Sequence, residues 1–242
     1  MFWFDSAAVA GDLEAERALV AEFRPFRVAT GVPVLSASVY ARAAGGEVVT
    51  GTTAPGGGGL GTGWALAVVD RRVEDLWFAL NTEEAHVGRF DLLQSEVIRG
   101  DPRASGRRVW QVVDLPAMFS DRWLCVDETF GADGYTRSGG KLWEIAWRDA
   151  TRPENLGGRT PPSGTTPVAS TAGGWLLVPL ADGRTLVQVH GATDPGGSVP
   201  ASVATSFASS ALASSIRDLA ALARELAPRS RRGYHRPEGS PL

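Results

Sequence analysis

A cation and a carboxylate on one predicted strand are the first candidates for ligand chemistry. In the strand predicted from Arg122 onward, alternation places Leu124 and Glu128 on the same face as Arg122. Charged groups on a mostly apolar face are costly to bury unless they are paired. They predict either a polar anchor for a ligand's hydroxyl or carboxylate, or a structural ion pair or turn clamp with Asp121 or a neighbouring strand.

A second candidate group is centred on His190, in a predicted strand close to the C-terminal helix. Alternation places His190 on the face of Leu186 and Gln188, opposite Val187 and Val189. If that face is inward, His190 and Gln188 are positioned to hydrogen-bond the polar end of a ligand. If it is not, His190 is a satisfied or rim histidine of the ordinary kind.

Metal and cofactor sites are not indicated by the sequence. His86, His190 and His235 are scattered without metal-ligand spacing, and Cys125 is the single cysteine. A G-x-G-x-x-G run starts at Gly56, but a strand follows where a dinucleotide fingerprint needs a helix, so we interpret it as a loop. The net charge of −3 does not favour nucleic-acid binding. We therefore predict no metal, no cofactor and no nucleic-acid partner.

Tryptophans are frequent on the predicted strands. Trp143 and Trp147 share one face with Ile145. Aromatic walls suit a flat hydrophobic ligand, but they suit the core between a sheet and a helix equally well. Both interpretations stay open, with Trp143 and Trp147 as candidate cavity residues.

The segment 200–227 is predicted to be a long lid helix, because it lacks glycine and has proline only at its start. Val203 and Phe207 lie on one stripe of this helix, and a second apolar stripe begins at Leu212. Small residues that include Ala211 lie between the two stripes. They either leave room for a ligand or allow close packing on a sheet.

These candidates need elements that bring them together. We predict an N-terminal helix at 6–23, a short helix at 70–80 and hairpin turns at Asp133-Gly134 and Asp182-Gly183. The predicted strands are 34–41, 47–52, 63–69, 91–99, 107–115, 122–130, 141–147, 175–180 and 184–190, with a long loop at 151–171. A sheet of about nine antiparallel strands must curl, and a long helix across its concave face completes an α+β core.

Two local motifs in this order resemble the START domain family, within the wider Bet v 1-like helix-grip superfamily. The first is RVWQVVDLPAMFSDR at 108–122, a strand that ends near a proline and is followed by a Ser-Asp-Arg turn. The second runs from Gly174-Trp175 through Asp182-Gly183 and Asp194-Pro195-Gly196-Gly197 to Pro200. The resemblance covers roughly 63–226. It implies a curved sheet wrapped around a lid helix and a cavity for a hydrophobic molecule such as a lipid, sterol, carotenoid or polyketide.

The resemblance also defines the expected function. We expect one START-like domain at 1–227 that binds, and transports or senses, a hydrophobic small molecule without catalysis. The alternative is an enzyme of the polyketide cyclase/aromatase type, with Arg122, Glu128 and His190 as candidates for acid–base chemistry.

Composition and the chain ends complete the expectations. The sequence shows neither a secretory leader nor a membrane-spanning run, so we expect a cytoplasmic protein. Lys141 is the only lysine, a bias typical of a GC-rich bacterial coding sequence. Residues 228–242 are interpreted as a disordered basic tail, which either contacts anionic lipid transiently or is merely solvated.

Overall fold

The computed structural model describes residues 6–53, 61–116, 118–197, 199 and 201–242 of the 242-residue chain. Its helices are α1 (Ser6–Glu22), α2 (Ala37–Ala44), α3 (Val73–Leu80), α4 (Ala132–Arg137) and α5 (Ala201–Leu226), with 3-10 turns η1 (Arg24–Phe26), η3 (Glu83–Ala85) and η4 (Pro153–Asn155). Its strands are β1 (Val49–Thr53), β2 (Thr62–Val69), β3 (Leu92–Arg99), β4 (Arg107–Val113), β5 (Arg122–Phe130), β6 (Trp143–Asp149), β7 (Thr166–Pro167), β8 (Ser170–Pro179) and β9 (Thr185–Asp194). No helix in these described ranges is long and apolar enough to cross a membrane.

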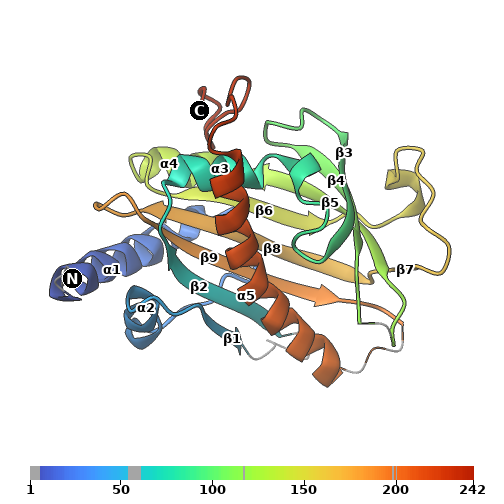
Figure 1. Ribbon diagram of the computed structural model, residues 1–242, viewed down its shortest axis with the longest axis horizontal. Helices are drawn as coiled ribbons and strands as arrows, with labels where there is room; N and C mark the ends of the chain where they lie inside the picture. Colours follow the sequence, from blue (N-terminus) through green and yellow to red (C-terminus); the bar gives the residue numbers. More distant parts are fainter. Residues whose placement is uncertain (1–5, 54–60, 117, 198, 200) are drawn as a thin grey trace.

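The strands form one curved sheet of nine strands, as the sequence predicted. The order is β1-β2-β9-β8-β6-β5-β4-β3, with antiparallel neighbours throughout, and β7 pairs in parallel with β5 off this path. Helix α5 runs across the concave face (Figure 1). The predicted α+β helix-grip architecture is therefore confirmed.

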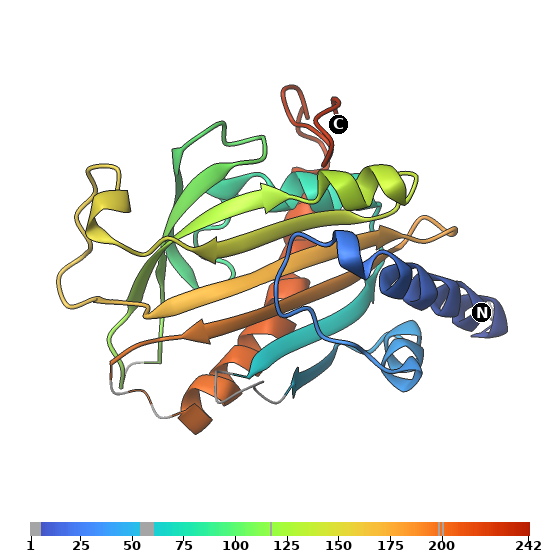
Figure 2. The same cartoon turned by 180° about the vertical axis from the view of Figure 1, so that it is seen from behind.

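Both faces of the sheet are covered, which explains the dense apolar runs of β8 and β9. The inner face, toward α5, carries Leu177 and Val187, which pack with Trp77 of α3 and Leu219 of α5. The outer face carries residues such as Leu176, which are covered by α1, α2 and the segment between them (Figure 2). Alternate residues of one strand thus enter two separate cores.

The region predicted as a strand at 34–41 is instead the N-cap and first part of helix α2, with residues 34 and 35 preceding the cap. Ser36 is its N-cap with extended backbone angles, and Tyr40 and Ala43 pack into the outer core at helical spacing. The alternation of VLSASVYA is also compatible with the first turns of a helix, and the alanines of this segment favour the helix. The strand prediction was wrong for this segment.

The Asp133-Gly134 pair does not form the predicted hairpin turn. It lies in the short helix α4, where Asp133 and Arg137 form an ion pair at 2.8 Å, four residues apart. The reversal into β6 is made at Gly139 and Gly140, which both have positive φ. Between β8 and β9, by contrast, the turn at Asp182-Gly183 is where the sequence predicts it, with Gly183 at φ 85°.

The segment 228–242 folds back over α3, which corrects the prediction of a disordered tail. Tyr234 is buried, with its ring edge-on to Phe78 at 4.6 Å between centroids. Trp77 Nε1 donates to the carbonyl of His235 at 2.8 Å, and Arg231 pairs with Asp75. Polar composition suggested disorder, but one aromatic side chain and these bonds fix the segment on the fold.

Candidate functional site

A cavity of about 320 Å³ lies between the inner face of the sheet and α5. Its wall is mostly apolar and comes from the end of α3, strands β3 to β6, β8, β9 and the middle of α5. Residues typical of this wall are Leu80, Phe90, Leu124, Trp175, Val189 and Leu212. A concave, mostly apolar space with a few polar groups is the usual form of a small-molecule site.

Arg122 lies at the wall of this cavity, where it holds a loop in place. Its Nε donates to the carbonyl of Pro195 at 2.6 Å, Nη2 donates to the carbonyl of Gly196 at 3.2 Å, and Nη1 donates to that of Ser120. The turn-clamp interpretation of the sequence is therefore the one that the geometry matches. Arg122 ties the chain just before α5 to the start of β5.

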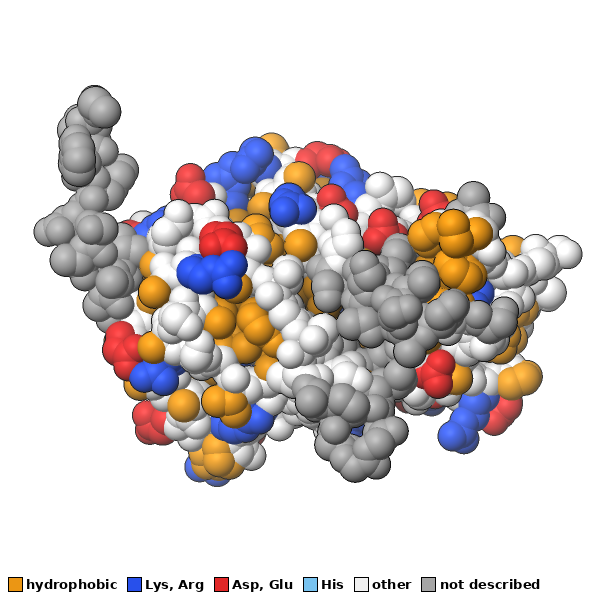
Figure 3. Space-filling view, turned by 90° about the horizontal axis from the view of Figure 1, so that it is seen from below, with side chains coloured by type: hydrophobic (Ala, Val, Ile, Leu, Met, Phe, Trp, Pro, Cys, Tyr) orange, Lys and Arg blue, Asp and Glu red, His pale blue; other side chains and the backbone are white. Residues whose placement is uncertain are grey.

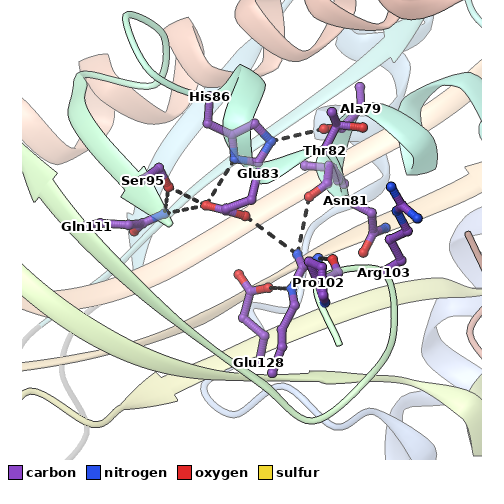
Figure 4. Close-up of polar contacts among 12 residues, drawn as sticks. Ala79, Asn81, Thr82, Glu83, His86, Ser95, Pro102, Arg103, Gln111 and Glu128 are labelled. Atoms are coloured by element: carbon purple, nitrogen blue, oxygen red, sulfur yellow. Dashed lines mark hydrogen bonds and ion pairs between the residues drawn. The ribbon is translucent and has the colours of Figure 1, made fainter. Parts of the chain in front are cut away.

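Six polar residues gather at the opposite end of β5, and we call them the polar cluster (Figure 4). Strand pairing places Arg107 of β4 directly opposite Glu128 of β5, and Gln111 of β4 opposite Ser95 of β3. Glu83 and His86 enter from η3 and the residue that follows it. The cluster consists of Glu83, His86, Ser95, Arg107, Gln111 and Glu128.

The way in which the chain leaves α3 positions Glu83 and His86 in this cluster. Asn81 Nδ2 and Thr82 Oγ1 donate to carbonyls of the last helical turn, each at 2.8 Å, and so end the helix. The chain then tightens into η3. His86 Nε2 donates to the carbonyl of Ala79 at 3.0 Å, which turns Nδ1 toward Glu83 at 3.3 Å.

Glu83 is the centre of the cluster. Its Oε1 accepts from Gln111 Nε2 at 3.1 Å and from Ser95 Oγ, and its Oε2 lies 3.7 Å from Arg107 Nη2. Glu83 is 3% exposed. The donors on Oε1 and the nearby charge of Arg107 together stabilise a carboxylate this deeply buried.

The surroundings of the two carboxyl groups in the cluster shift their pKa values in opposite directions. Burial opposes ionisation of Glu83, but the charge of His86, together with its hydrogen bond and the charge of Arg107, holds the pKa of Glu83 well below its usual range. Burial also disfavours the charged form of His86, yet the neighbouring Glu83 raises the pKa of His86. Burial raises the pKa of Glu128, and Arg107 offsets only part of this.

Trp147 forms part of the cavity floor because two glycines leave space for its ring. A methyl group on Gly173 would lie 2.3 Å from the Trp147 ring, and one on Gly191 would lie 3.2 Å from it. Trp147 Nε1 donates to Thr171 Oγ1 at 3.3 Å. Any larger residue at 173 would therefore displace the indole.

The cavity contains five of the ten residues that the sequence proposed for it: Arg122, Leu124, Glu128, Trp147 and Ala211. Trp143 is also on the inner face, but it packs against Trp77 and Tyr135, with ring centroids 5.5 and 5.3 Å away, in the solid core beyond the cavity. Val203 and Phe207 lie in 201–209, and the structure does not describe the side chains of this segment. Residues 54–60, which include Gly56 of the G-x-G-x-x-G run, also lie outside the described residues.

Gln188 and His190 point to the outer face, which corrects the expectation that they contact a ligand. His190 is 1% exposed, and its Nε2 donates to the carbonyl of Thr30, in the segment between α1 and α2. Glu144 supports the same segment, pairing with Arg27 and accepting from the Val28 backbone N–H at 2.9 Å. These residues fasten the N-terminal segment to the sheet.

Comparison with known proteins identifies the fold. No protein-family model and no curated protein matches the sequence. Among solved structures, a STAR-related lipid transfer protein fragment from Xanthomonas axonopodis has a TM-score of 0.59 at 17% identity, covering 72% of this chain and 92% of that one. Human StAR-related lipid transfer protein 5 has a TM-score of 0.54 at 14% identity, covering 92% and 100%. The lipid transfer and protein localization domain of human StarD13 has a TM-score of 0.55 at 16% identity, covering 74% and 84%.

The chain has a START-like helix-grip fold. In this START-like fold the curved sheet and the long helix α5 have the arrangement that the sequence predicted.

Sequence reasoning missed four members of the polar cluster that this START-like fold brings together: Glu83, Ser95, Arg107 and Gln111; it noted His86 only as an isolated histidine. A signal was present in β4, where alternation places Arg107 and Gln111 on the same face as Val109 and Val113. Polar residues on a mostly apolar face were also the reason for choosing Arg122 and Glu128 in β5. No comparable pattern marked Glu83, because the turn that follows α3 has no periodicity.

Proposed function

We propose that this START-like protein binds one hydrophobic, lipid-like small molecule in the cavity between the sheet and α5, without catalysis. The observation that carries the proposal is an apolar cavity of about 320 Å³ whose wall includes one buried polar cluster. An apolar body gains free energy from leaving water, at about 25 cal/mol per Å² buried. A single polar end then fixes its orientation.

The surface is consistent with a small-molecule ligand. In the face drawn in Figure 3, the acidic and basic side chains that are coloured are interspersed, without the one-sided basic patch that nucleic-acid binding needs. The proposal extends to transport or sensing of the ligand. Transient contact with a lipid surface would deliver it, and Met118, 80% exposed next to the cavity residue Phe119, supports such a contact.

Native mass spectrometry with organic extraction tests the proposal. The purified protein is expected to carry, or to take up from a neutral dye such as Nile red, one apolar molecule per chain. Ala211→Trp, which projects a large ring into the cavity, is expected to abolish this binding. Ser210→Trp, at an exposed position of the same helix, is the matched control. Failure of the wild type to bind any apolar molecule would overturn the proposal.

A second candidate function is acid–base catalysis on a hydrophobic substrate, of the cyclase/aromatase type. The observation in its favour is that Glu128, whose pKa is raised by burial, and His86 both line the cavity. Incubation with a linear poly-β-ketone analogue, followed by mass spectrometry, distinguishes the two functions. A cyclised product that Glu128→Gln no longer forms would favour the enzyme.

A further inference from the structure

The polar cluster presents hydrogen-bond acceptors to the cavity. The first is the side-chain carbonyl of Gln111. Its amide nitrogen lies 3.1 Å from Glu83 Oε1 and 3.2 Å from Ser95 Oγ. An ionised carboxylate only accepts hydrogen bonds, so the nitrogen must face Glu83. The Oε1 atom of Gln111 is then left without a partner among the described residues, on a side chain that lines the cavity.

The second acceptor belongs to Glu128. Its Oε2 accepts from Arg107 Nε at 2.6 Å, whereas Oε1 accepts no hydrogen bond within the described part of the chain. The Glu128 side chain keeps 13% exposure, and it lines the cavity. Its second oxygen is therefore the other acceptor that a ligand can reach.

The cation of the cluster does not present a donor to the cavity. Arg107 is fully buried, at 0% side-chain exposure, behind the wall. Its Nε donates to Glu128, Nη1 to the carbonyl of Pro102 and Nη2 to that of Leu80. His86 likewise uses Nε2 on Ala79 and turns Nδ1 to Glu83. The positive charges neutralise the two carboxylates but do not reach the cavity as donors.

The other polar groups of the wall are either engaged or neutral, like the indole N–H of Trp175. Arg122 directs its guanidinium to three backbone carbonyls. Thr171 and Thr193 bond to each other at 2.9 Å, and Ser215 donates to the carbonyl of Leu212 at 2.9 Å. A ligand carboxylate or phosphate in this cavity would lose its hydration without gaining the cationic donors that a buried anion requires.

We propose that the ligand's polar end is an uncharged hydrogen-bond donor, a hydroxyl group, and that Gln111 and Glu128 make the cavity select an alcohol over a carboxylate or phosphate with the same apolar body. A hydroxyl donates to either acceptor and has no charge to desolvate. This inference rests on the proposed function. It adds that the polar end of the ligand is uncharged and donates a hydrogen bond.

Three probes with one apolar body test the selectivity directly: dodecanol, dodecyl methyl ether and dodecanoate. Each is titrated at pH 8, where dodecanoate is ionised, against wild-type protein carrying Nile red. We expect dodecanol to bind at least about tenfold more tightly than the other two probes, the ratio that corresponds to one well-made hydrogen bond of about 1.4 kcal/mol. Equal or tighter binding of dodecanoate would overturn the inference and leave the proposed function standing. Failure of Nile red and of all three probes to bind would overturn both.

Two variants assign the selectivity to its residues. Gln111→Leu removes one acceptor, so the advantage of dodecanol over the ether is expected to shrink while binding of the ether persists. Glu128→Gln removes a carboxylate charge, so the deficit of dodecanoate is expected to narrow. Glu144→Gln is the matched control, because Glu144 is also a buried carboxylate paired with arginine, but on the outer face. Unchanged probe ratios in both folded cavity variants would contradict the assignment.

Discussion

His190 is a buried histidine in a place where protonation is unfavourable. Burial, with a smaller contribution from the charge of Arg27, lowers the pKa of His190 to about 4. Its Nε2 bonds to Thr30 in the N-terminal segment, and its Nδ1 is buried without a partner among the described residues. The folded state therefore holds this imidazole neutral, whereas the unfolded chain protonates it near pH 6.5.

From this difference we predict acid sensitivity. Between about pH 6.5 and 4 the unfolded state binds the extra proton, so stability falls as the pH falls through this window and levels off below it. The loss is at most about 3.5 kcal/mol, from about 1.4 kcal/mol for each pH unit. Urea denaturation from pH 7.5 to 4 measures it, and His190→Gln, which keeps a donor for Thr30, should show a flatter profile. Parallel profiles for the two proteins would refute the prediction.

Arg107 is the residue on which the polar cluster depends. Its removal leaves Glu83 and Glu128 buried without their shared cation. We predict that Arg107→Ala lowers the free energy of unfolding by about 3–5 kcal/mol, as for other buried pairs broken on one side. Arg137→Ala is the control, because its ion pair with Asp133 is more than half exposed, and it should cost less than about 1 kcal/mol. Chemical denaturation compares the two, and similar losses would contradict this view of the cluster.

At the scale of elements, the segment 228–242 acts as a brace for α3. Tyr234 packs on Phe78, its hydroxyl lies 3.2 Å from Thr82 Oγ1, and Arg103 lies over its ring. Thr82 is the residue before Glu83, so the brace supports the turn that delivers the polar cluster. A segment with a polar composition thus holds a buried part of the site in place.

We predict a graded response to changes at Tyr234. Tyr234→Phe removes only the hydrogen bond to Thr82 and should cost about 1 kcal/mol. Tyr234→Ala also removes the packed ring and should cost about 3–5 kcal/mol, as for other large-to-small changes in a core. The midpoint of thermal unfolding, followed by tryptophan fluorescence, measures both. If Tyr234→Ala unfolds at the wild-type temperature, the segment does not brace α3.

Elements with a strong period were predictable from sequence, and those fixed by tertiary contacts were not. Alternation in β5 placed Arg122, Leu124 and Glu128 on one face correctly, and all three reach the cavity. Alternation in β9 also grouped Gln188 with His190, but the pattern cannot tell an inner from an outer face when both are buried. The covering helices decide this, and α2 was itself misread as a strand. Glu83 joins the site through the turn that follows α3, which no local pattern specifies.

At the scale of the whole molecule, the sheet separates two cores with different tasks. The inner core supports the cavity, and its described lining begins at Leu80. The outer core joins Leu13 and Tyr40 of the N-terminal helices to Trp64 and Leu176 of the sheet. Among the side chains that the structure describes, none from the N-terminal helices lines the cavity, so these helices stabilise the sheet from its outer face.

This division predicts that loss of residues 1–47 damages stability more than ligand chemistry. Deletion exposes the outer face around Trp64 and Leu176 and leaves Glu144 without Arg27. Each large apolar side chain returned to water costs about 1.5–3 kcal/mol, so a loss of several kcal/mol and self-association through the exposed face are expected. Denaturation and light scattering measure these effects, and Nile red binding to the folded fraction should persist. Leu13→Ala in the full chain isolates the packing part, at about 2–5 kcal/mol. A truncated protein that stays monomeric with wild-type stability would show that the outer core is dispensable, and the sheet would then have to derive its stability from the inner face alone.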